Sequence, residues 1–508
     1  MLKAKTCEAR DEPHTLPMAC HPRHAAARQR GQPVRVAGAP HWPRGRPVLR
    51  SAGAVASDMR RTLRWLSAAL TCLALGTAAA TMPAHAAADW QDDFDALLAG
   101  LASNYANFED QIRVRRLELP ALAARQRKAL TEATDDAGRR AALEGLLRAL
   151  RDPHVRIDWA PAADQAPGPV CASGIDGGRE GRLQWSRWPA FTPLAHDTAR
   201  IFSAGLLRRP DGRRLGIVRL GLFVESAYPL ACAEAARRLG LAPDAPCDAS
   251  CAERRDAVAA QVLDTALVDT VRALRAAGAA MLVLDISDNG GGSDWNEAVA
   301  RRLVGPLRSA RIALLKHPAW QDWIDGRLNT LAPGAPEAVE WRRVRSQVAR
   351  PCDLSVAWSD GEITTGVRPL PCSTLVHGRL HSLGTVEPWG PPVPPGVNRL
   401  PLVLLVNEET HSAAEQFAAL LQDNRRARIV GSATAGAACG TFTAQGTRFT
   451  LPHSGARVHV PDCVRLRDDG SNERRGIVPD TMVPWAPSDS PWLRTVKAAQ
   501  TLGRLSLR

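Results

Sequence analysis

The chain has 508 residues, of which 45% are apolar and 23% are charged, a composition typical of a globular protein with two or three domains. Its net charge of +13 is concentrated near the start, because residues 1–86 hold 13 Lys/Arg and 4 Asp/Glu and leave an excess of only +4 for the remainder. Such a small and dispersed excess of positive charge argues against a nucleic-acid-binding protein. The longest apolar run, near residue 66, is too short and alanine-rich for a membrane span.

Residues 59–86 have the three parts of a secretory signal peptide. Three arginines precede an apolar run over 66–80, and a small-x-small cleavage site follows over 84–86. We therefore expect a mature protein that begins at Ala87 and is periplasmic or secreted. Residues 1–58 are rich in Arg, Pro and His without apolar periodicity, so we expect them to be unstructured and to result from a start codon assigned too far upstream.

Eight cysteines follow the expected cleavage point, and an even number in an oxidising compartment predicts disulfides. The spacing of Cys247 and Cys251 also fits a metal half-site, but no His or second Cys pair stands nearby at zinc-finger spacing, so we predict no metal. The favoured local pairs are Cys352–Cys372 and Cys439–Cys463, each closing a loop of about 20 residues. The remaining four leave their pairing open: Cys171, Cys232, Cys247 and Cys251.

The first part of the mature chain, residues 87–158, is predicted to be a helical region. Leu143, Leu146, Leu147 and Leu150 follow the i, i+3, i+4, i+7 spacing of a buried helix face, and this helix is expected to end before Pro153. Residues 159–270 are irregular and contain cysteines, with a strand expected over 215–223 and a helix running to about 276.

From residue 271 to 490, apolar runs alternate with amphipathic segments. Strands are predicted over 280–286, 401–407 and 428–431, and helices over 294–304 and 412–422. This alternation predicts an α/β core with a largely parallel sheet. Residues 491–508 are left as a C-terminal tail.

Two motifs of this core carry possible chemistry, and each also has a purely structural interpretation. Ser412 begins a helix, where backbone N–H groups favour a developing anion, but Ser-x-x-Glu with Glu415 is also a capping box. The loop Asp288-Asn-Gly-Gly-Gly-Ser293 allows the close backbone approach of an oxyanion hole, or it forms a tight strand-to-helix turn. Taken singly, the structural interpretation is favoured for both.

Two further residues are of the types used in acid–base catalysis. His154 follows the helical region and titrates near neutrality, but a lone histidine at a helix end is more often a cap or a surface residue. Glu473, in Asn-Glu-Arg-Arg-Gly-Ile-Val-Pro-Asp, is by itself an exposed loop charge.

Taken together and in order, these segments resemble the tail-specific, or C-terminal processing, serine protease family. The matching pieces are LVLDISDNGGG, PLVLLVNEETHSAAEQFAALLQDNRRARIVGSATAG and ERRGIVPD, with LRDPHVRI upstream. The resemblance implies a ClpP/crotonase-like fold, a protein or peptide substrate and no cofactor. It also implies that Ser412 is the nucleophile and that the amides of Gly291 and Ala413 form the oxyanion hole.

The base distinguishes two branches of this family. Processing proteases with a Ser–Lys dyad carry the lysine where this chain has Ala437, and no lysine stands nearby to replace it. The tricorn-like branch instead uses Ser–His–Glu, with the histidine in a D-x-H motif. The resemblance therefore implies a triad of Ser412, His154 and Glu473, with His154 within about 4 Å of Ser412 and Glu473 on its far nitrogen.

Several subsidiary expectations follow from the same resemblance. Glu415 and Asp423 are assigned supporting roles, and His411 is a poor base because neighbouring residues at a helix start point in different directions. No PDZ-like segment is present to indicate substrate choice. The alternative is a non-catalytic relative that binds a peptide or an apolar ligand in the same cleft, whereas export argues against a crotonase-type acyl-CoA enzyme.

Overall fold

The computed structural model describes the helical region and nearly all of the core. The described residues are 84–159, 167–171, 174–196, 200–350, 358–359, 362–363, 373–375, 379–380, 387, 389, 392–443 and 447–506. The segment expected to be unstructured, most of the signal peptide, and the predicted pair Cys352–Cys372 lie outside them. The expected cleavage point after Ala86 falls in the first turn of α1 (Ala84–Asn104).

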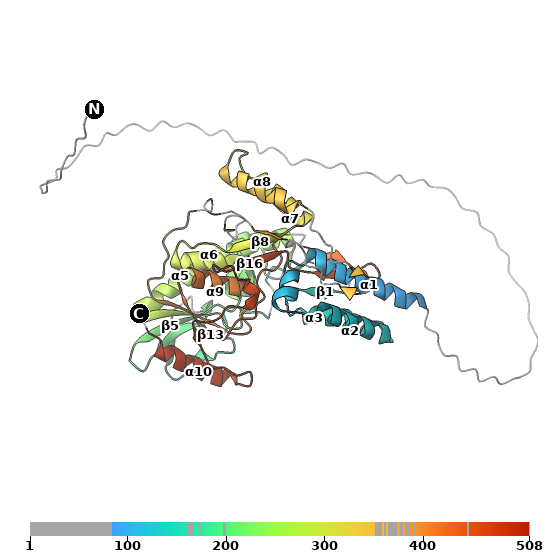
Figure 1. Cartoon of the computed structure of the whole chain (residues 1–508). Helices are drawn as coiled ribbons and strands as arrows, with labels where there is room; N and C mark the ends of the chain where they lie inside the picture. Colours follow the sequence, from blue (N-terminus) through green and yellow to red (C-terminus); the bar gives the residue numbers. More distant parts are fainter. Residues whose placement is uncertain are drawn as a thin grey trace, which may run out of the picture. The chain divides into compact units, whose positions relative to one another are not determined.

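The N-terminal helical region matches the prediction from its leucine spacing. It consists of α1, a π-helical turn (Asp110–Val114), α2 (Leu119–Glu132) and α3 (Asp136–Ala149), drawn together in blue and teal in Figure 1. Asp135 caps α3 by accepting a hydrogen bond from the Gly138 amide, and the leucine face of α3 is buried. After α3 the chain enters β1 (Arg156–Asp158), which pairs antiparallel with β15 (Arg457–His459) and so joins this region to the C-terminal part of the core.

A seven-stranded sheet forms the centre of the core. Its order is β17-β13-β12-β7-β5-β4-β3; the first five strands are mutually parallel, β4 runs antiparallel to β5, and β3 runs antiparallel to β4. The strands are β3 (Phe191–Pro193), β4 (Ala204–Arg208), β5 (Arg214–Arg219), β7 (Ala279–Asp285), β12 (Leu402–Val406), β13 (Arg428–Gly431) and β17 (Thr481–Met482). The largely parallel sheet of the predicted α/β core is therefore confirmed.

Helices bury both faces of this sheet, which is why its strands are apolar throughout. Leu282 and Leu284 face one side, whereas Met281 and Val283 face the other. The first side is covered by α4 (Pro229–Leu239), α5 (Ala249–Ala276), α6 (Trp295–Val304) and α9 (Ala413–Asp423). The second side is covered by α10 (Pro491–Arg504), so the expected C-terminal tail is instead a helix packed on the core.

A smaller antiparallel sheet lies outside the predicted elements. It has the order β11-β8-β16 and packs with α7 and α8 around two buried tryptophans, Trp320 and Trp341. Its elements are β8 (Arg311–Leu315), α7 (Pro318–Leu328), α8 (Pro336–Val348), β11 (Ser373–Leu375) and β16 (Cys463–Leu466). The remaining short strands are β2 (Gly168–Pro169), β6 (Pro246–Cys247), β9 (Trp358–Ser359), β10 (Glu362–Ile363) and β14 (Phe449–Thr450).

Three disulfides join described residues: Cys171–Cys232, Cys247–Cys251 and Cys439–Cys463. The last confirms a predicted pair, and the first two settle the four cysteines whose pairing the spacing left open. Among the described residues, no helix combines the length and apolar character needed to cross a membrane. Within the same residues, no group of three or more His, Cys, Asp or Glu is arranged to hold a metal ion.

Candidate active site

Ser412 lies in a strained turn between a buried strand and a helix. The strand β12 ends at Val406, α9 begins at Ala413, and Ser412 between them has φ 52° and ψ −115°. A positive φ is costly for a residue other than glycine, and such outliers gather at functional sites. The strained strand–turn–helix position exposes a serine hydroxyl beside free helix amides, as in a nucleophile elbow. The Ser412 side chain itself makes no capping hydrogen bond.

Glu415 stabilises this turn through the hydrogen bonds that its carboxylate accepts. Its carboxylate is fully buried and accepts the Ser412 amide at 3.0 Å. The same carboxylate also accepts four donors from the loop that follows β13, namely Thr434 Oγ1 and the amides of Gly436, Ala437 and Ala438. Glu415 therefore ties the serine turn to a loop more than 20 residues away, which is a supporting role beyond that of a capping box.

His154 meets Ser412 from the helical region. Its Nε2 atom lies 2.9 Å from Ser412 Oγ, although the two residues are 258 positions apart in the sequence. The sequence resemblance placed this pair within about 4 Å, and the structure brings them together as predicted. The histidine side chain keeps 22% of its exposure, so the pair is open to a substrate on one side.

The carboxylate beside the far nitrogen of His154 belongs to Asp152. Asp152 Oδ1 accepts the His154 amide at 3.0 Å and lies 3.5 Å from Nδ1, which has no hydrogen-bond partner among the described residues. Its other oxygen, Oδ2, accepts the Tyr105 hydroxyl at 2.7 Å and pairs with Arg474 at 2.8 Å. Burial acts to raise the pKa of Asp152, but the contacts with His154 and Arg474 lower it below its usual value overall.

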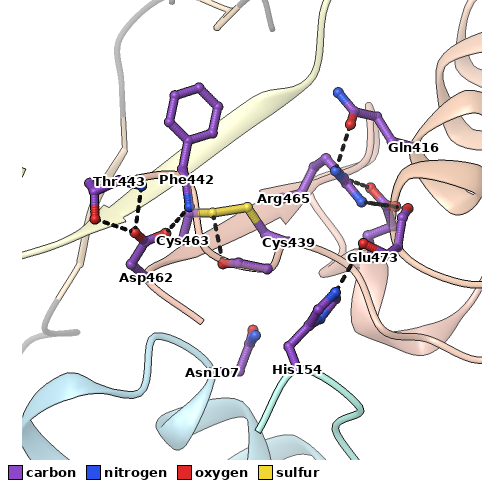
Figure 2. Close-up of a disulfide and its surroundings, with 12 residues drawn as sticks. Asn107, His154, Gln416, Cys439, Phe442, Thr443, Asp462, Cys463, Arg465 and Glu473 are labelled. Atoms are coloured by element: carbon purple, nitrogen blue, oxygen red, sulfur yellow. Dashed lines mark hydrogen bonds and ion pairs between the residues drawn. A yellow bond between two sulfur atoms is a disulfide. The ribbon is translucent and has the colours of Figure 1, made fainter. Parts of the chain in front are cut away.

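Glu473 has a different partner from the predicted one. Instead of reaching His154, its buried carboxylate forms a bidentate ion pair with Arg465 of β16, at 2.5 Å to Nε and 2.9 Å to Nη2 (Figure 2). Arg465 in turn donates to the Ser412 carbonyl at 3.2 Å and to Gln416 at 3.0 Å. Glu473 therefore acts on the serine side of the site, because the Arg465 guanidinium links its carboxylate to the Ser412 carbonyl.

The glycine loop approaches Ser412 as the oxyanion-hole prediction requires. A Cβ atom on Gly291 would lie 2.8 Å from Ser412 Cβ and 2.9 Å from the Ala413 nitrogen, and Gly291 has φ 93°, so only glycine fits here. However, the Gly291 amide donates to Asn289 Oδ1 at 2.8 Å and does not point at the serine as a free donor. The Asn289 side chain folds back onto the loop in an Asx turn, which the sequence did not reveal.

Three other residues singled out in the sequence lie aside from the serine–histidine contact. Asp423 is at the far end of α9, where it pairs with Arg467. The His411 ring contacts the Glu409 carbonyl at 2.7 Å, in agreement with its expected unsuitability as a base. Ala437, at the position of the family's lysine, is fully buried.

An open pocket of about 530 Å³ adjoins the site on the histidine side. It lies between the α3–β1 connection and the turns that precede Ser412 and follow β13. Its walls combine apolar side chains (Leu147, Val155 and Ile157) with basic ones (Arg148, Arg151 and Arg156), and His411 and Ala435 close it. Ser412 and His154 do not themselves line this pocket, which reaches the site through their chain neighbours His411, Pro153 and Val155.

Sequence reasoning missed Tyr105, Arg465 and Arg474, which hold the carboxylates in place. Arg474 was quoted within ERRG but had no assigned role, and Arg465 lies on β16, which no apolar pattern indicated. Asp152 was quoted as part of a motif without a role of its own. The only available signal was its position two residues before His154, within reach of a local turn.

Comparisons with known proteins match part of the chain to a peptidase family and the whole fold to solved structures. The model of peptidase family S41 matches residues 372–483, which include Ser412 and Glu473. The solved structure of mature CPAF superimposes with a TM-score of 0.57 at 14% identity, covering 83% of this chain and 97% of that chain. CPAF complexed with lactacystin gives 0.56 at 14% (83% and 98%), and a serine-to-alanine mutant of CPAF gives 0.52 at 13% (83% and 97%). These likenesses show a shared fold. No curated protein sequence matches the chain.

Proposed function

We propose that this chain, whose residues 372–483 match the model of peptidase family S41, is a serine-type peptidase acting on a protein or peptide, with Ser412 as its nucleophile and His154 as its general base. The observation that carries the proposal is the 2.9 Å separation of His154 Nε2 and Ser412 Oγ. This is hydrogen-bond distance for a base that removes the hydroxyl proton. In the branch of the family that uses a lysine as general base, the lysine stands at the position of Ala437. Here His154 takes the role of general base instead.

The proposed reaction proceeds through an acyl-enzyme. Ser412 Oγ attacks the scissile carbonyl while His154 Nε2 takes the hydroxyl proton, and the same nitrogen then delivers it to the leaving amine. In the second half, His154 removes a proton from water, and the resulting hydroxide attacks the acyl carbon and releases Ser412. Because Nε2 must begin as an acceptor, the neutral imidazole carries its proton on Nδ1, and the carboxylate that faces Nδ1 is that of Asp152.

We therefore assign the orienting carboxylate to Asp152 in place of Glu473. A small rotation of the imidazole would shorten the 3.5 Å separation of Nδ1 and Asp152 Oδ1 to a hydrogen bond, as is common when a substrate tightens an unliganded site. Arg474 and Tyr105 hold the other carboxylate oxygen and keep Asp152 ionised. Glu473 serves the nucleophile by holding Arg465 on the Ser412 carbonyl.

The oxyanion is proposed to bind at the start of α9. The Ala413 amide follows the nucleophile directly and lies at the positive end of an 11-residue helix, where a developing negative charge is stabilised. Gly291 contributes a close approach of the glycine loop to the nucleophile, because a Cβ atom there would lie only 2.8 Å from Ser412 Cβ. Its own amide becomes a second donor only if the Asn289 side chain releases it on substrate binding.

The enzyme is proposed to work outside the cytoplasm. The tripartite pattern of residues 59–86 supports export, and three disulfides among the described residues are in keeping with an oxidising compartment. N-terminal sequencing of the exported protein is expected to give Ala87. An exported form that retains residues 60–86 would contradict the proposal.

The decisive experiment is covalent labelling of the purified protein with a fluorophosphonate probe. Wild-type protein is expected to be labelled at Ser412, Ser412→Ala to remain unlabelled, and His154→Ala to react far more slowly. Peptide mapping of the labelled product identifies the modified residue. A folded wild-type protein that is never labelled and binds peptides without cleaving them would instead be a non-catalytic relative.

A further inference from the structure

We propose that the Cys439–Cys463 disulfide positions His154 for reaction with Ser412, so that full turnover requires this bond to be formed. The inference rests on the catalytic roles proposed above for these two residues. It assigns a function to a structural feature that lies beside the site without belonging to the serine–histidine pair (Figure 2).

The first half of the argument is the contact between the disulfide loop and the imidazole. Gly440 follows Cys439 directly and packs so closely on His154 that a Cβ atom there would lie 3.0 Å from Cδ2 and 3.1 Å from Nε2. Nε2 is the same atom that lies 2.9 Å from Ser412 Oγ. The Gly440 backbone therefore forms a wall that limits where the reactive nitrogen can move.

The second half concerns the other cysteine. Cys463 begins β16 and pairs with Leu314 of β8, so it is fixed in a sheet. Two residues along the same strand, and hence on the same face, Arg465 donates to the Ser412 carbonyl. The disulfide thus links Gly440, which limits the movement of His154, to strand β16, whose Arg465 holds the Ser412 carbonyl.

Apart from the disulfide, the contacts of the described residues anchor the loop mainly on either side of this point. Before it, the amides of Ala437 and Ala438 donate to Glu415, and after it the amides of Phe442 and Thr443 donate to the buried carboxylate of Asp462. Between these anchors, Gly440 accepts one long hydrogen bond of 3.2 Å from the Asp462 amide. Without the covalent bond, the anchors preserve the fold, and the single hydrogen bond from Asp462 holds Gly440 against the ring less firmly.

Such a movement affects the rate more than the fold. A displacement of about 1 Å in an active site is sufficient to lower a rate about 10²-fold. Breaking the bond takes two electrons and two protons from a dithiol, which is oxidised to its own disulfide, and leaves two thiols at Cys439 and Cys463. The reduced chain is accordingly expected to be a folded but weakly active enzyme.

The test compares two disulfides in the full-length exported protein. Cys439→Ala/Cys463→Ala is expected to lower kcat about 10- to 100-fold with KM nearly unchanged, because the base acts in the chemical step. Cys171→Ala/Cys232→Ala is the matched control. It removes a bond that closes 61 residues rather than 24, so it is expected to cost more thermal stability, yet it lies away from the site and should leave kcat within about twofold.

Two further measurements separate positioning from stability. The pH profile of kcat should change in shape for Cys439→Ala/Cys463→Ala and not for the control, since only the first alters the base. If that variant does not fold, Gly440→Ala in the oxidised protein tests the same wall. Gly440 has no positive φ, so the new Cβ presses on the His154 ring with the disulfide intact, and an approximately tenfold loss of kcat at unchanged melting temperature is expected.

The outcomes distinguish this inference from the proposed function. If oxidised wild-type protein neither cleaves peptides nor is labelled at Ser412, the proposed function fails. If the oxidised wild-type protein is active and labelled, but the folded Cys439→Ala/Cys463→Ala variant keeps wild-type kcat and pH profile, the positioning role is overturned. An active oxidised enzyme whose kcat falls on dithiol treatment, in step with titration of Cys439 and Cys463 thiols and not in the variant lacking them, supports it.

Discussion

Replacing Asp152 with asparagine tests which carboxylate orients the base. In the native site Oδ1 faces the amide and Nδ1 of His154, and Oδ2 faces the Tyr105 hydroxyl and the Arg474 guanidinium. All four are donors, so the asparagine amide has no position where its NH₂ group meets an acceptor. The orientation in which the asparagine NH₂ group faces Arg474 is the less favourable one, because the buried guanidinium cation would then face a hydrogen-bond donor.

The amide NH₂ is therefore expected to turn toward His154. The imidazole then presents Nδ1 as the acceptor and carries its proton on Nε2, which can no longer accept the Ser412 proton. A wrong tautomer of this kind costs about 10³- to 10⁴-fold in kcat, or roughly 4–5 kcal/mol of transition-state stabilisation. Leaving Arg474 without its ionised partner also lowers the free energy of unfolding by about 3–5 kcal/mol.

Glu473→Gln is the matched comparison. Its side chain is equally buried and equally paired with an arginine, so a similar loss of stability is expected, but the tautomer of His154 is untouched and kcat should stay within about tenfold of wild type. The assay is kcat on a peptide substrate together with thermal unfolding of both variants. The assignment is refuted if Glu473→Gln costs about 10³-fold while folded Asp152→Asn retains nearly full turnover.

Further expectations concern the nucleophile, its neighbours and pH. Ser412→Ala and His154→Ala should each lower kcat at least about 10³-fold with little change in melting temperature, measured side by side. Gly291→Ala should abolish fluorophosphonate labelling in a protein that still folds, because its Cβ would lie 2.8 Å from that of Ser412 at φ 93°; normal labelling would show that the loop yields. Ala437→Lys should lower the melting temperature without raising kcat, since the position is fully buried. Because the folded-state pKa of Asp152 lies below its unfolded value of 3.8, its stabilising contribution is complete above that pH and lost as pH falls through the folded pKa. The difference in unfolding free energy between wild type and Asp152→Asn should therefore shrink in acid unfolding series below about pH 3.8.

The sequence predicted those parts of the fold that have long apolar periodicity. The strands at 280–286, 401–407 and 428–431 and the helices between them match β7, β12, β13, α6 and α9 within about two residues. The smaller sheet was not predicted, because its strands have three to five residues and are buried by tryptophans of α7 and α8 rather than by an alternating pattern of their own. The helix α10 was missed because its buried face includes Thr495 and two alanines.

The candidate site shows the same division between local pattern and long-range contact. The family resemblance carried by the ordered motifs singled out Ser412, Gly291 and His154, and it predicted that Ser412 and His154 meet, as the structure shows. The partner of Glu473 was predicted wrongly because two buried carboxylates near the site, Asp152 and Glu473, are each paired with an arginine, and only the positions of the arginines determine which one faces the imidazole.

The two halves of the site meet at a single short turn. Glu473 and Arg474 are consecutive residues of the 3₁₀ turn Glu473–Arg475, and their side chains are both buried. Glu473 pairs with Arg465, which holds the carbonyl of Ser412, whereas Arg474 pairs with Asp152, which faces His154. Glu473 therefore acts on the Ser412 half of the site and Arg474 on the His154 half. The order of these two charges in the sequence determines which half each residue stabilises. The turn thus joins the helical region to the core in the register that brings Nε2 of His154 to Oγ of Ser412.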